Sequence, residues 1–311
     1  MLPMLSTIAT LLVGSSFTFA QTLQDVTDFG PVYETSLTMK IYVPSELPSN
    51  PAILLAWHWK RTQLTYSTIF GQLHGCGGSG QQYFSSTKYT GLADAHGVIL
   101  IYPSTPKDSN CWDNHSNKSL SHGGHGDTEV LINMVDYIVD EYNADANRVF
   151  VVGTSSGCMM TNSLSATYPD RVAAVSCYSG VAAGCLAGQK GSSPISSDRE
   201  CSNGNVQKTG EEWAKQVHAM YPGYDGNYPR FLTWHGNADT LVFYQNLIEQ
   251  LKEWSTIQGV EFSKNETDTP EKGYTKMVYG DGTKLVGISA DGVGHVVPNH
   301  EEEDFKWFGL I

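Results

Sequence analysis

Short apolar segments alternate with helical patterns along this chain, and that alternation restricts its fold more than any other feature. Apolar runs without regular polar alternation are typical of strands buried on both faces of a sheet. The candidate strands are Ile53–Ala56, Val98–Tyr102, Val149–Val152, Ala173–Cys177 and Phe231–Trp234. Apolar side chains at helical spacing follow Asp127, which we expect to cap a helix. Strands joined by crossover helices predict an α/β fold with a mostly parallel central sheet and helices on both faces.

The composition is that of one globular domain that avoids anionic partners. Of the 311 residues, 40% are hydrophobic and 16% are charged, which provides enough apolar material for a large core. No long linker or repeat divides the chain, so we predict a single domain over residues 21–311. The net charge of −13 would repel nucleic acid and anionic lipid heads.

The first twenty residues have the pattern of a signal peptide. They carry no charged side chain, and an apolar run from Ile8 to Val13 is followed by small residues suited to cleavage, ending at Ala20. The apolar run is too short to span a bilayer. We therefore expect a secreted protein without a membrane span.

A secreted chain can carry disulfides and glycans. Cys185 and Cys201 bracket a polar Gly/Ser-rich loop, so a disulfide between them would stabilise the fold by about 3 kcal/mol. Asn-x-Ser/Thr sequons begin at Asn114, Asn117 and Asn265, and each is a candidate glycosylation site.

The strongest chemical signal is the sequence Gly-Thr-Ser-Ser-Gly at residues 153–157. It lies between the candidate strand that ends at Val152 and a helical run through Leu164. At a strand-to-helix turn, the two glycines remove Cβ atoms that would clash in a sharp elbow, and the helix N-terminus lies beside a developing oxyanion. We therefore interpret Ser155 as a nucleophile rather than as part of a plain glycine turn.

A serine nucleophile needs a base, an acid that orients the base, and donors for the oxyanion. In α/β-hydrolases the acid and the histidine follow the serine, which selects Asp239 and His295, both placed after expected strands. The alternative is that both are solvated loop residues. Upstream, the His-Gly-Cys-Gly-Gly sequence at residues 74–78 has the form of an oxyanion loop. The predicted donors are the backbone N–H groups of Cys76 and Ser156.

A metal site is a competing interpretation for His122, His125 and Asp127, which lie close in sequence. The stretch is glycine-rich and lacks both H-E-x-x-H spacing and a fixed helical face, which favours solvated loop histidines. We predict no metal and no cofactor.

These motifs and their surroundings resemble the fungal acetylxylan esterases of the first carbohydrate esterase family, whose relatives include feruloyl esterases and polyhydroxybutyrate depolymerases. The resemblance spans nearly the whole chain after residue 20. Beyond the candidate catalytic residues, it rests on Tyr42-Val43-Pro44, Tyr102-Pro103-Ser104, Cys111-Trp112-Asp113, Met159-Met160-Thr161-Asn162, Tyr178-Ser179-Gly180-Val181, Met220-Tyr221-Pro222-Gly223-Tyr224 and Gly294-His295-Val296-Val297-Pro298.

The resemblance implies an α/β-hydrolase fold and a secreted serine esterase that removes acetyl groups from acetylated xylan through an acyl-enzyme. Ser155 is then the nucleophile, His295 the general base and Asp239 its orienting acid. We expect a monomer without a carbohydrate-binding module. The alternatives are a feruloyl esterase or a polyhydroxybutyrate-type depolymerase, which differ in acyl pocket size, and an inactive carbohydrate-binding protein, against which the intact triad argues.

The resemblance also implies a Cys76–Cys111 disulfide and places Trp112 in the wall of the substrate site. Two features depart from the pattern of the family. Residues 57–72 form an insertion between a candidate strand and the oxyanion loop, either a genuine loop beside the acyl pocket or a retained intron. Cys158 stands where a small residue is usual, and we expect it to be a buried free thiol.

Overall fold

A computed structural model describes residues 22–45 and 68–311. The expected signal peptide, the candidate strand Ile53–Ala56 and residues 57–67 of the expected insertion lie outside the described residues. The strands are β1 (Gln24–Val26), β2 (Thr38–Tyr42), β3 (Thr68–Leu73), β4 (Val98–Ser104), β5 (Val149–Thr154), β6 (Ala174–Tyr178), β7 (Arg230–Gly236), β8 (Phe262–Thr267), β9 (Tyr274–Tyr279) and β10 (Leu285–Ala290). The α-helices are α1 (Gly80–Ser86), α2 (Tyr89–His96), α3 (Asp127–Tyr142), α4 (Ser156–Thr167), α5 (Gly210–Met220), α6 (Gln245–Gln258) and α7 (Glu301–Phe308), and a 3-10 turn covers Pro169–Arg171.

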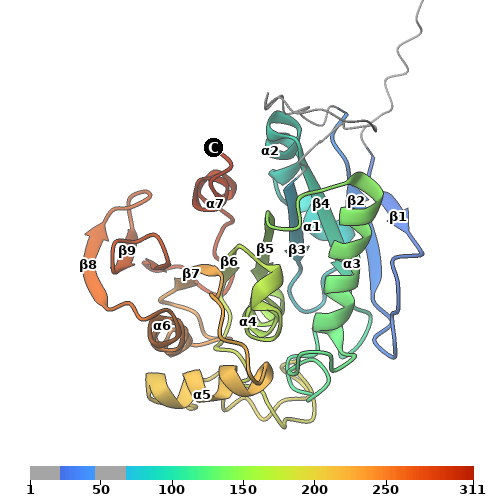
Figure 1. Cartoon of the computed structure of the whole chain (residues 1–311). Helices are drawn as coiled ribbons and strands as arrows, with labels where there is room; N and C mark the ends of the chain where they lie inside the picture. Colours follow the sequence, from blue (N-terminus) through green and yellow to red (C-terminus); the bar gives the residue numbers. More distant parts are fainter. Residues whose placement is uncertain (1–21, 46–67) are drawn as a thin grey trace, which may run out of the picture.

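All these strands belong to one sheet, in the order β1-β2-β4-β3-β5-β6-β7-β10-β9-β8 (Figure 1). The six central strands, from β4 to β10 in that order, run parallel, and antiparallel strands flank them on both sides. The predicted mostly parallel sheet is confirmed.

Successive residues of the central strands serve opposite faces of the sheet. In β5, Val149 and Val151 belong to the core cluster that includes residues of α3, α4 and α6, whereas Phe150 and Val152 belong to the cluster that includes residues of α1, α2 and α7. Both sets are buried, which explains why these strands have apolar runs instead of an alternating pattern. Helix α5 packs against α6 rather than against the sheet.

Four expected strands are confirmed as β4, β5, β6 and β7, and the helix expected after Asp127 is α3. The N-cap of α3 is Gly126 rather than Asp127, and the Asp127 carboxylate instead accepts a hydrogen bond from the N–H of Asp113. Residues 68–72 of the expected insertion form most of β3, which pairs with β4 and β5, so the loop alternative does not hold for these five residues. Gly71 and Gln72 interrupt the apolar residues of this strand, so a search for apolar runs does not find it.

The expectation of a free thiol at Cys158 is also wrong, since Cys158 in α4 is bonded to Cys177 in β6. Both side chains lie in the core between α4 and the sheet, where their Cα atoms are 4.7 Å apart. Cys185 is bonded to Cys201, as expected from the loop between them. No helix within residues 22–45 and 68–311 combines the length and apolar character needed to cross a membrane.

Candidate active site

The three candidate catalytic residues follow three parallel strands at their carboxyl ends. Ser155 follows β5, Asp239 lies three residues beyond β7, and His295 lies five residues beyond β10. Strands β7 and β10 are neighbours, and only β6 separates β5 from β7. Side chains that follow parallel strands at one edge can meet there. The fold therefore brings together residues that are far apart in the sequence.

Ser155 occupies a strained turn between β5 and α4. Its φ of +55° and ψ of −119° lie in a region that L-residues rarely adopt. A Cβ at Gly153 would overlap the carbonyl oxygen of Gly157, and a Cβ at Gly157 would overlap that of Leu73. Both glycines of the motif are therefore needed for the close approach of helix and strand, which lifts the Ser155 side chain to the edge of the sheet.

The side chains of Ser155, His295 and Asp239 form a continuous hydrogen-bonded relay. His295 Nε2 lies 2.8 Å from Ser155 Oγ, and His295 Nδ1 lies 2.7 Å from Asp239 Oδ2. An ionised carboxylate can only accept, so Nδ1 carries the proton and Nε2 is left to accept from the serine hydroxyl. This arrangement can take a proton from Ser155 as its oxygen attacks an electrophile.

The Asp239 carboxylate is held in its charged form. Burial alone would raise its pKa, but hydrogen bonds from His235, His295 and the N–H groups of Val242 and Leu241 outweigh burial and hold the pKa well below its usual range. His235 is fully buried, with Nε2 2.7 Å from the carbonyl oxygen of Val242 and 3.3 Å from Asp239 Oδ2. Sequence reasoning missed this second histidine, although it lies only four residues before the aspartate.

The candidate oxyanion loop, residues 74–78, runs directly beside Ser155. A Cβ at Gly75 would lie 3.4 Å from Ser155 Cβ and 4.0 Å from Ser155 Oγ. The Cys76–Cys111 disulfide links the loop to the segment between β4 and α3, as the family resemblance implied. His74 is buried, with Nδ1 2.7 Å from the carbonyl oxygen of Gly75, which agrees with a structural rather than a catalytic role.

The assignment of Trp112 to the wall of the substrate site is wrong. Its side chain is fully buried, and its Nε1–H donates to the carbonyl oxygen of His74 at 2.8 Å. Its backbone N–H donates to Ser156 Oγ at 2.9 Å. Trp112 therefore braces the oxyanion loop against the first turn of α4 from behind, where substrate has no access.

The sequon at Asn114 is also unsuitable for a glycan. Asn114 is 3% exposed, and its amide group donates to the carbonyl oxygens of Trp112 and Ser156. A glycan would replace one of the two amide hydrogens and so remove one of these bonds, and the buried nitrogen leaves no space for a sugar. Asn117 and Asn265 are exposed and stay candidates.

Ser155 and His295 open into a cavity of about 370 Å³, which we call the apolar hollow. Its apolar wall comes from α4 and from the loops after β6 and β7: Met159, Val181, Leu186, Pro194, Leu241 and Val242. The size lies within the range of ligand sites, ~300–1,000 Å³. These residues have no common spacing, so no pattern in the sequence could have identified them.

The three residues considered for a metal site do not converge. His122 stacks on Tyr221 with ring centroids 3.7 Å apart, and His125 faces Glu129. The buried Asp127 carboxylate is bonded to the backbone of the preceding loop. Within the described part of the chain, no group of three or more His, Cys, Asp or Glu side chains could hold a metal ion.

Two relatives and one solved structure that this chain resembles are all named as esterases. Residues 61–242 match the family model described as Esterase PHB depolymerase. Feruloyl esterase B of Neurospora crassa is 46% identical, over 93% of this chain and 93% of that protein. Acetylxylan esterase A of Aspergillus awamori is 41% identical, over 93% and 89%. The solved acetyl xylan esterase from Aspergillus awamori superposes with a TM-score of 0.83 at 39% identity, covering 93% of this chain and all of that one.

Proposed function

The chain belongs to the Esterase PHB depolymerase family and is a carboxylic ester hydrolase with an α/β-hydrolase fold, and we propose that it is a secreted serine esterase that removes acetyl groups from acetylated xylan. The serine mechanism is carried by one observation, the relay of 2.8 Å and 2.7 Å from Ser155 through His295 to Asp239. The acetylated substrate is supported by relatives named acetylxylan esterase in sequence and in structure.

In the acylation step, Ser155 Oγ attacks the acetyl carbonyl carbon and its proton passes to His295 Nε2. The tetrahedral intermediate collapses as the bond from the carbonyl carbon to the sugar oxygen breaks. His295 returns the proton to that oxygen, so the sugar leaves as a neutral alcohol and the acetyl group stays on Ser155. Asp239, held ionised, orients the imidazole and stabilises its charged form.

In the deacylation step, a water molecule gives a proton to His295 and attacks the acetyl-serine. The ester bond to Ser155 breaks, the serine recovers its proton from His295, and acetic acid leaves and ionises to acetate in solution.

The oxyanion of both intermediates is assigned to the backbone N–H groups of Cys76 and Ser156. The oxyanion loop contacts Ser155, and Ser156 is the first residue of α4, where N–H groups lack helical acceptors. Neither N–H donates to another residue within 22–45 or 68–311. Two such donors beside the attacked carbonyl stabilise the negative charge as it develops.

A feruloyl esterase is the second candidate, and two observations favour it. The apolar hollow of about 370 Å³ is larger than an acetyl group requires. In addition, the relatives named feruloyl esterase B reach 46% identity, above the acetylxylan esterases at 40–41%.

Export is part of the proposal. The described residues contain three disulfides, Cys76–Cys111, Cys158–Cys177 and Cys185–Cys201. Structural disulfides form and persist in oxidising compartments. Together with the signal-peptide pattern of the first twenty residues, they support secretion.

The decisive experiment measures release of acetate from acetylated xylan, of ferulate from methyl ferulate, and of hydroxybutyrate from polyhydroxybutyrate by the purified enzyme. We expect acetate release to have the highest kcat/KM, and a preference for methyl ferulate would instead select the second candidate. Ser155→Ala should abolish labelling by a fluorophosphonate and lower turnover by on the order of 10⁴–10⁶-fold. The surface variant Ser85→Ala is the matched control, and equal activity of the two variants would refute the serine mechanism.

A further inference from the structure

A second cavity of different chemistry adjoins the apolar hollow. It has a volume of about 490 Å³, and we call it the polar hollow. Tyr83, Val296, Val297 and Pro298 give it some apolar surface. Its polar lining comes from α1 and the residue before it, the turn after α1, and the start of α7 with the segment before it: Ser79, Gln82, Ser86, Lys88, Asn299 and Glu301. The two hollows share Gly75, Cys76, Thr154 and Val296 as lining residues. They therefore meet at the oxyanion loop, beside the reacting bond.

The polar hollow presents hydrogen-bonding groups that the described protein does not use. Gln82 Nε2, Asn299 Nδ2 and Lys88 Nζ each have no partner among the described residues. Asn299 Oδ1 accepts one long hydrogen bond, from the Tyr83 hydroxyl at 3.5 Å, and a bond of that length is weak. Amide side chains supply donors and acceptors together, which matches the hydroxyl groups of a sugar.

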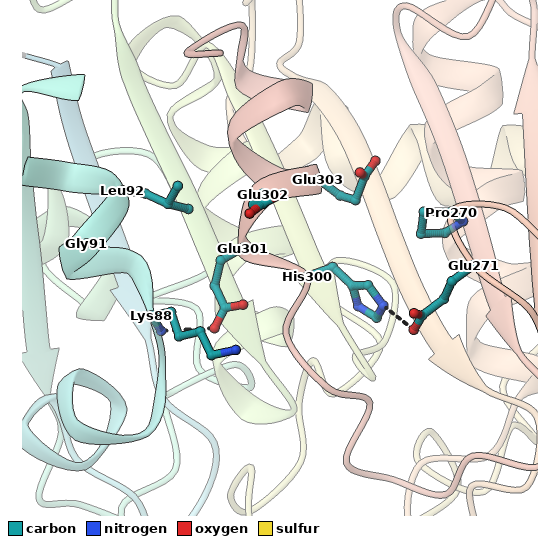
Figure 2. A pocket seen from close by; sticks show the side chains of 9 residues that line it. All are labelled: Lys88, Gly91, Leu92, Pro270, Glu271, His300, Glu301, Glu302 and Glu303. Carbon is teal, nitrogen blue, oxygen red and sulfur yellow. Dashed lines mark hydrogen bonds and ion pairs between the residues drawn. The ribbon is translucent and has the colours of Figure 1, made fainter. Parts of the chain in front are cut away.

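The polar surface continues away from Ser155. A further cavity of about 490 Å³ shares Lys88 and Glu301 with the polar hollow (Figure 2). Leu92 and Pro270 give it apolar patches, and Glu271 Oε1 lies 3.2 Å from its neighbour His300 Nε2 in the lining (Figure 2). We treat these two adjoining cavities together and call them the polar groove.

We propose that this polar groove binds the neutral sugar chain of the ester, with Gln82 and Asn299 as specificity-determining residues, while the acyl group enters the apolar hollow. The assignment rests on the proposed function, because it requires a glycan ester as substrate. Apolar walls favour a methyl or aromatic acyl group, and the polar lining favours the hydroxyl-rich leaving group. The bond that breaks lies where the two hollows meet.

The charges of the groove restrict the glycan to a neutral one. Glu271, Glu301, Glu302 and Glu303 line its outer part, where Lys88 is the one lysine or arginine among the lining residues. Carboxylates accept hydrogen bonds from sugar hydroxyls but repel the carboxylate of a uronic acid. Xylan segments without uronic acid side groups therefore fit best.

The kinetic test compares two acetyl esters that differ only in the leaving group, an acetylated xylo-oligosaccharide and 4-nitrophenyl acetate. Gln82→Ala and Asn299→Ala should lower kcat/KM about tenfold for the oligosaccharide and less than about twofold for the aryl ester. Gln81→Ala is the matched control, because Gln81 is the exposed neighbour on α1 and does not line the groove. Equal losses on both substrates, or no loss on either, would overturn the assignment.

A binding measurement separates this inference from the proposed function. Calorimetry with xylotetraose and the inactive Ser155→Ala enzyme reports the sugar site without any ester chemistry. We expect binding that is weakened about tenfold in Ser155→Ala/Gln82→Ala, and weaker binding of a glucuronate-substituted oligosaccharide. If the oligosaccharide binds but acetylated xylan is not hydrolysed, the acetyl function fails and the groove stands. If xylotetraose does not bind, the groove assignment fails whatever ester is cleaved.

Discussion

The hydroxyl of Tyr178 accepts a hydrogen bond from the backbone N–H of His300 at 3.0 Å, so the last residue of β6 holds the segment that carries His295. The same hydroxyl lies 2.9 Å from the buried carboxyl group of Asp304 in α7. At its other end, the carbonyl oxygen of Tyr178 accepts the N–H of Ser155 at 2.7 Å. One residue therefore positions both the serine and the histidine segment of the relay.

Tyr178→Phe removes the shared hydroxyl and leaves the His300 N–H and Asp304 without this partner. We expect a loss of about 2–3 kcal/mol in the free energy of unfolding and a fall in kcat for 4-nitrophenyl acetate, since the segment before α7 can shift. Tyr42→Phe is the matched control, because Tyr42 also donates to a carboxylate, that of Asp94, far from the relay. Equal kcat values for the two variants would show that Tyr178 does not position the site.

Asp239→Asn tests the tautomer of His295. An amide NH₂ in place of Asp239 Oδ2 would donate to Nδ1 and move the histidine proton to Nε2, which could then no longer accept from Ser155. We expect kcat to fall by about 10³–10⁴-fold. Asp291→Asn is the control, because the Asp291 carboxylate accepts a hydrogen bond from the Asn237 side chain at the same edge of the sheet. Wild-type kcat in Asp239→Asn would remove Asp239 from the relay.

The same variant changes the pH dependence of stability. The folded-state pKa of Asp239 lies below its ordinary value of about 4, so the carboxylate stabilises the fold above that pH. This contribution is lost as the pH falls below about 4. Chemical denaturation should therefore show a smaller stability difference between wild type and Asp239→Asn at pH 3 than at pH 6.

Asp127 makes the stability of the fold depend on pH in the opposite direction. Burial raises its pKa to about 7, and the charge of Asp113 adds to the shift, while the Asp113 N–H and Lys107 oppose it. The folded state keeps the proton from about pH 4 to about pH 7 while the unfolded state loses it, so stability falls over that interval by on the order of 4 kcal/mol. Asp127→Asn keeps an acceptor for Asp113 and should be more stable than wild type at pH 8, but not at pH 4. Asp140→Asn on the same helix is the control, and parallel stability curves for Asp127→Asn and wild type would contradict the prediction.

The Cys158–Cys177 disulfide closes a loop with a sequence separation of 19. Such a cross-link stabilises the fold by about 3 kcal/mol through the entropy of the unfolded chain. We expect the double variant Cys158→Ala/Cys177→Ala to lose about that amount. Peptide mapping without reduction should find all six cysteines paired, and alkylation of Cys158 or Cys177 in the folded protein would disprove the pairing.

Removal of residues 57–72 tests whether residues 52–56 would form a more stable β3 strand than residues 68–72 do. Joining Ala56 to Leu73 would place residues 52–56, Ala-Ile-Leu-Leu-Ala, at the positions of 68–72. The Gln72 side chain is fully buried beside the Tyr102 hydroxyl, and its amide makes no hydrogen bond of ordinary geometry within the described part of the chain, which costs about 1–3 kcal/mol for each unsatisfied group. Ala56 would remove that cost.

We therefore expect the shortened enzyme to have a higher Tm and at least wild-type activity on acetyl esters. Sequencing of the mature transcript tests independently whether the segment is translated. Loss of acetyl esterase activity on deletion would show that the segment belongs to the working enzyme.

Features that depend on neighbouring residues could be predicted from the amino-acid sequence alone. Apolar runs identified β4 to β7 because a strand buried on both faces has no polar alternation. The glycines around Ser155 identified its turn, since the steric requirement of that turn lies within five residues. Chain order then selected Asp239 and His295.

Contacts between residues that are distant in the sequence became visible only in the folded chain. Ser155 and His295 are 140 positions apart, and their 2.8 Å contact depends on the order of strands in the sheet, which hydrophobic periodicity does not encode. The Cys158–Cys177 bond, the buried position of Trp112 and the choice of residues 68–73 as β3 have the same origin. Each depends on what packs across the sheet, because a side chain is buried or exposed by neighbours that come from elsewhere in the chain.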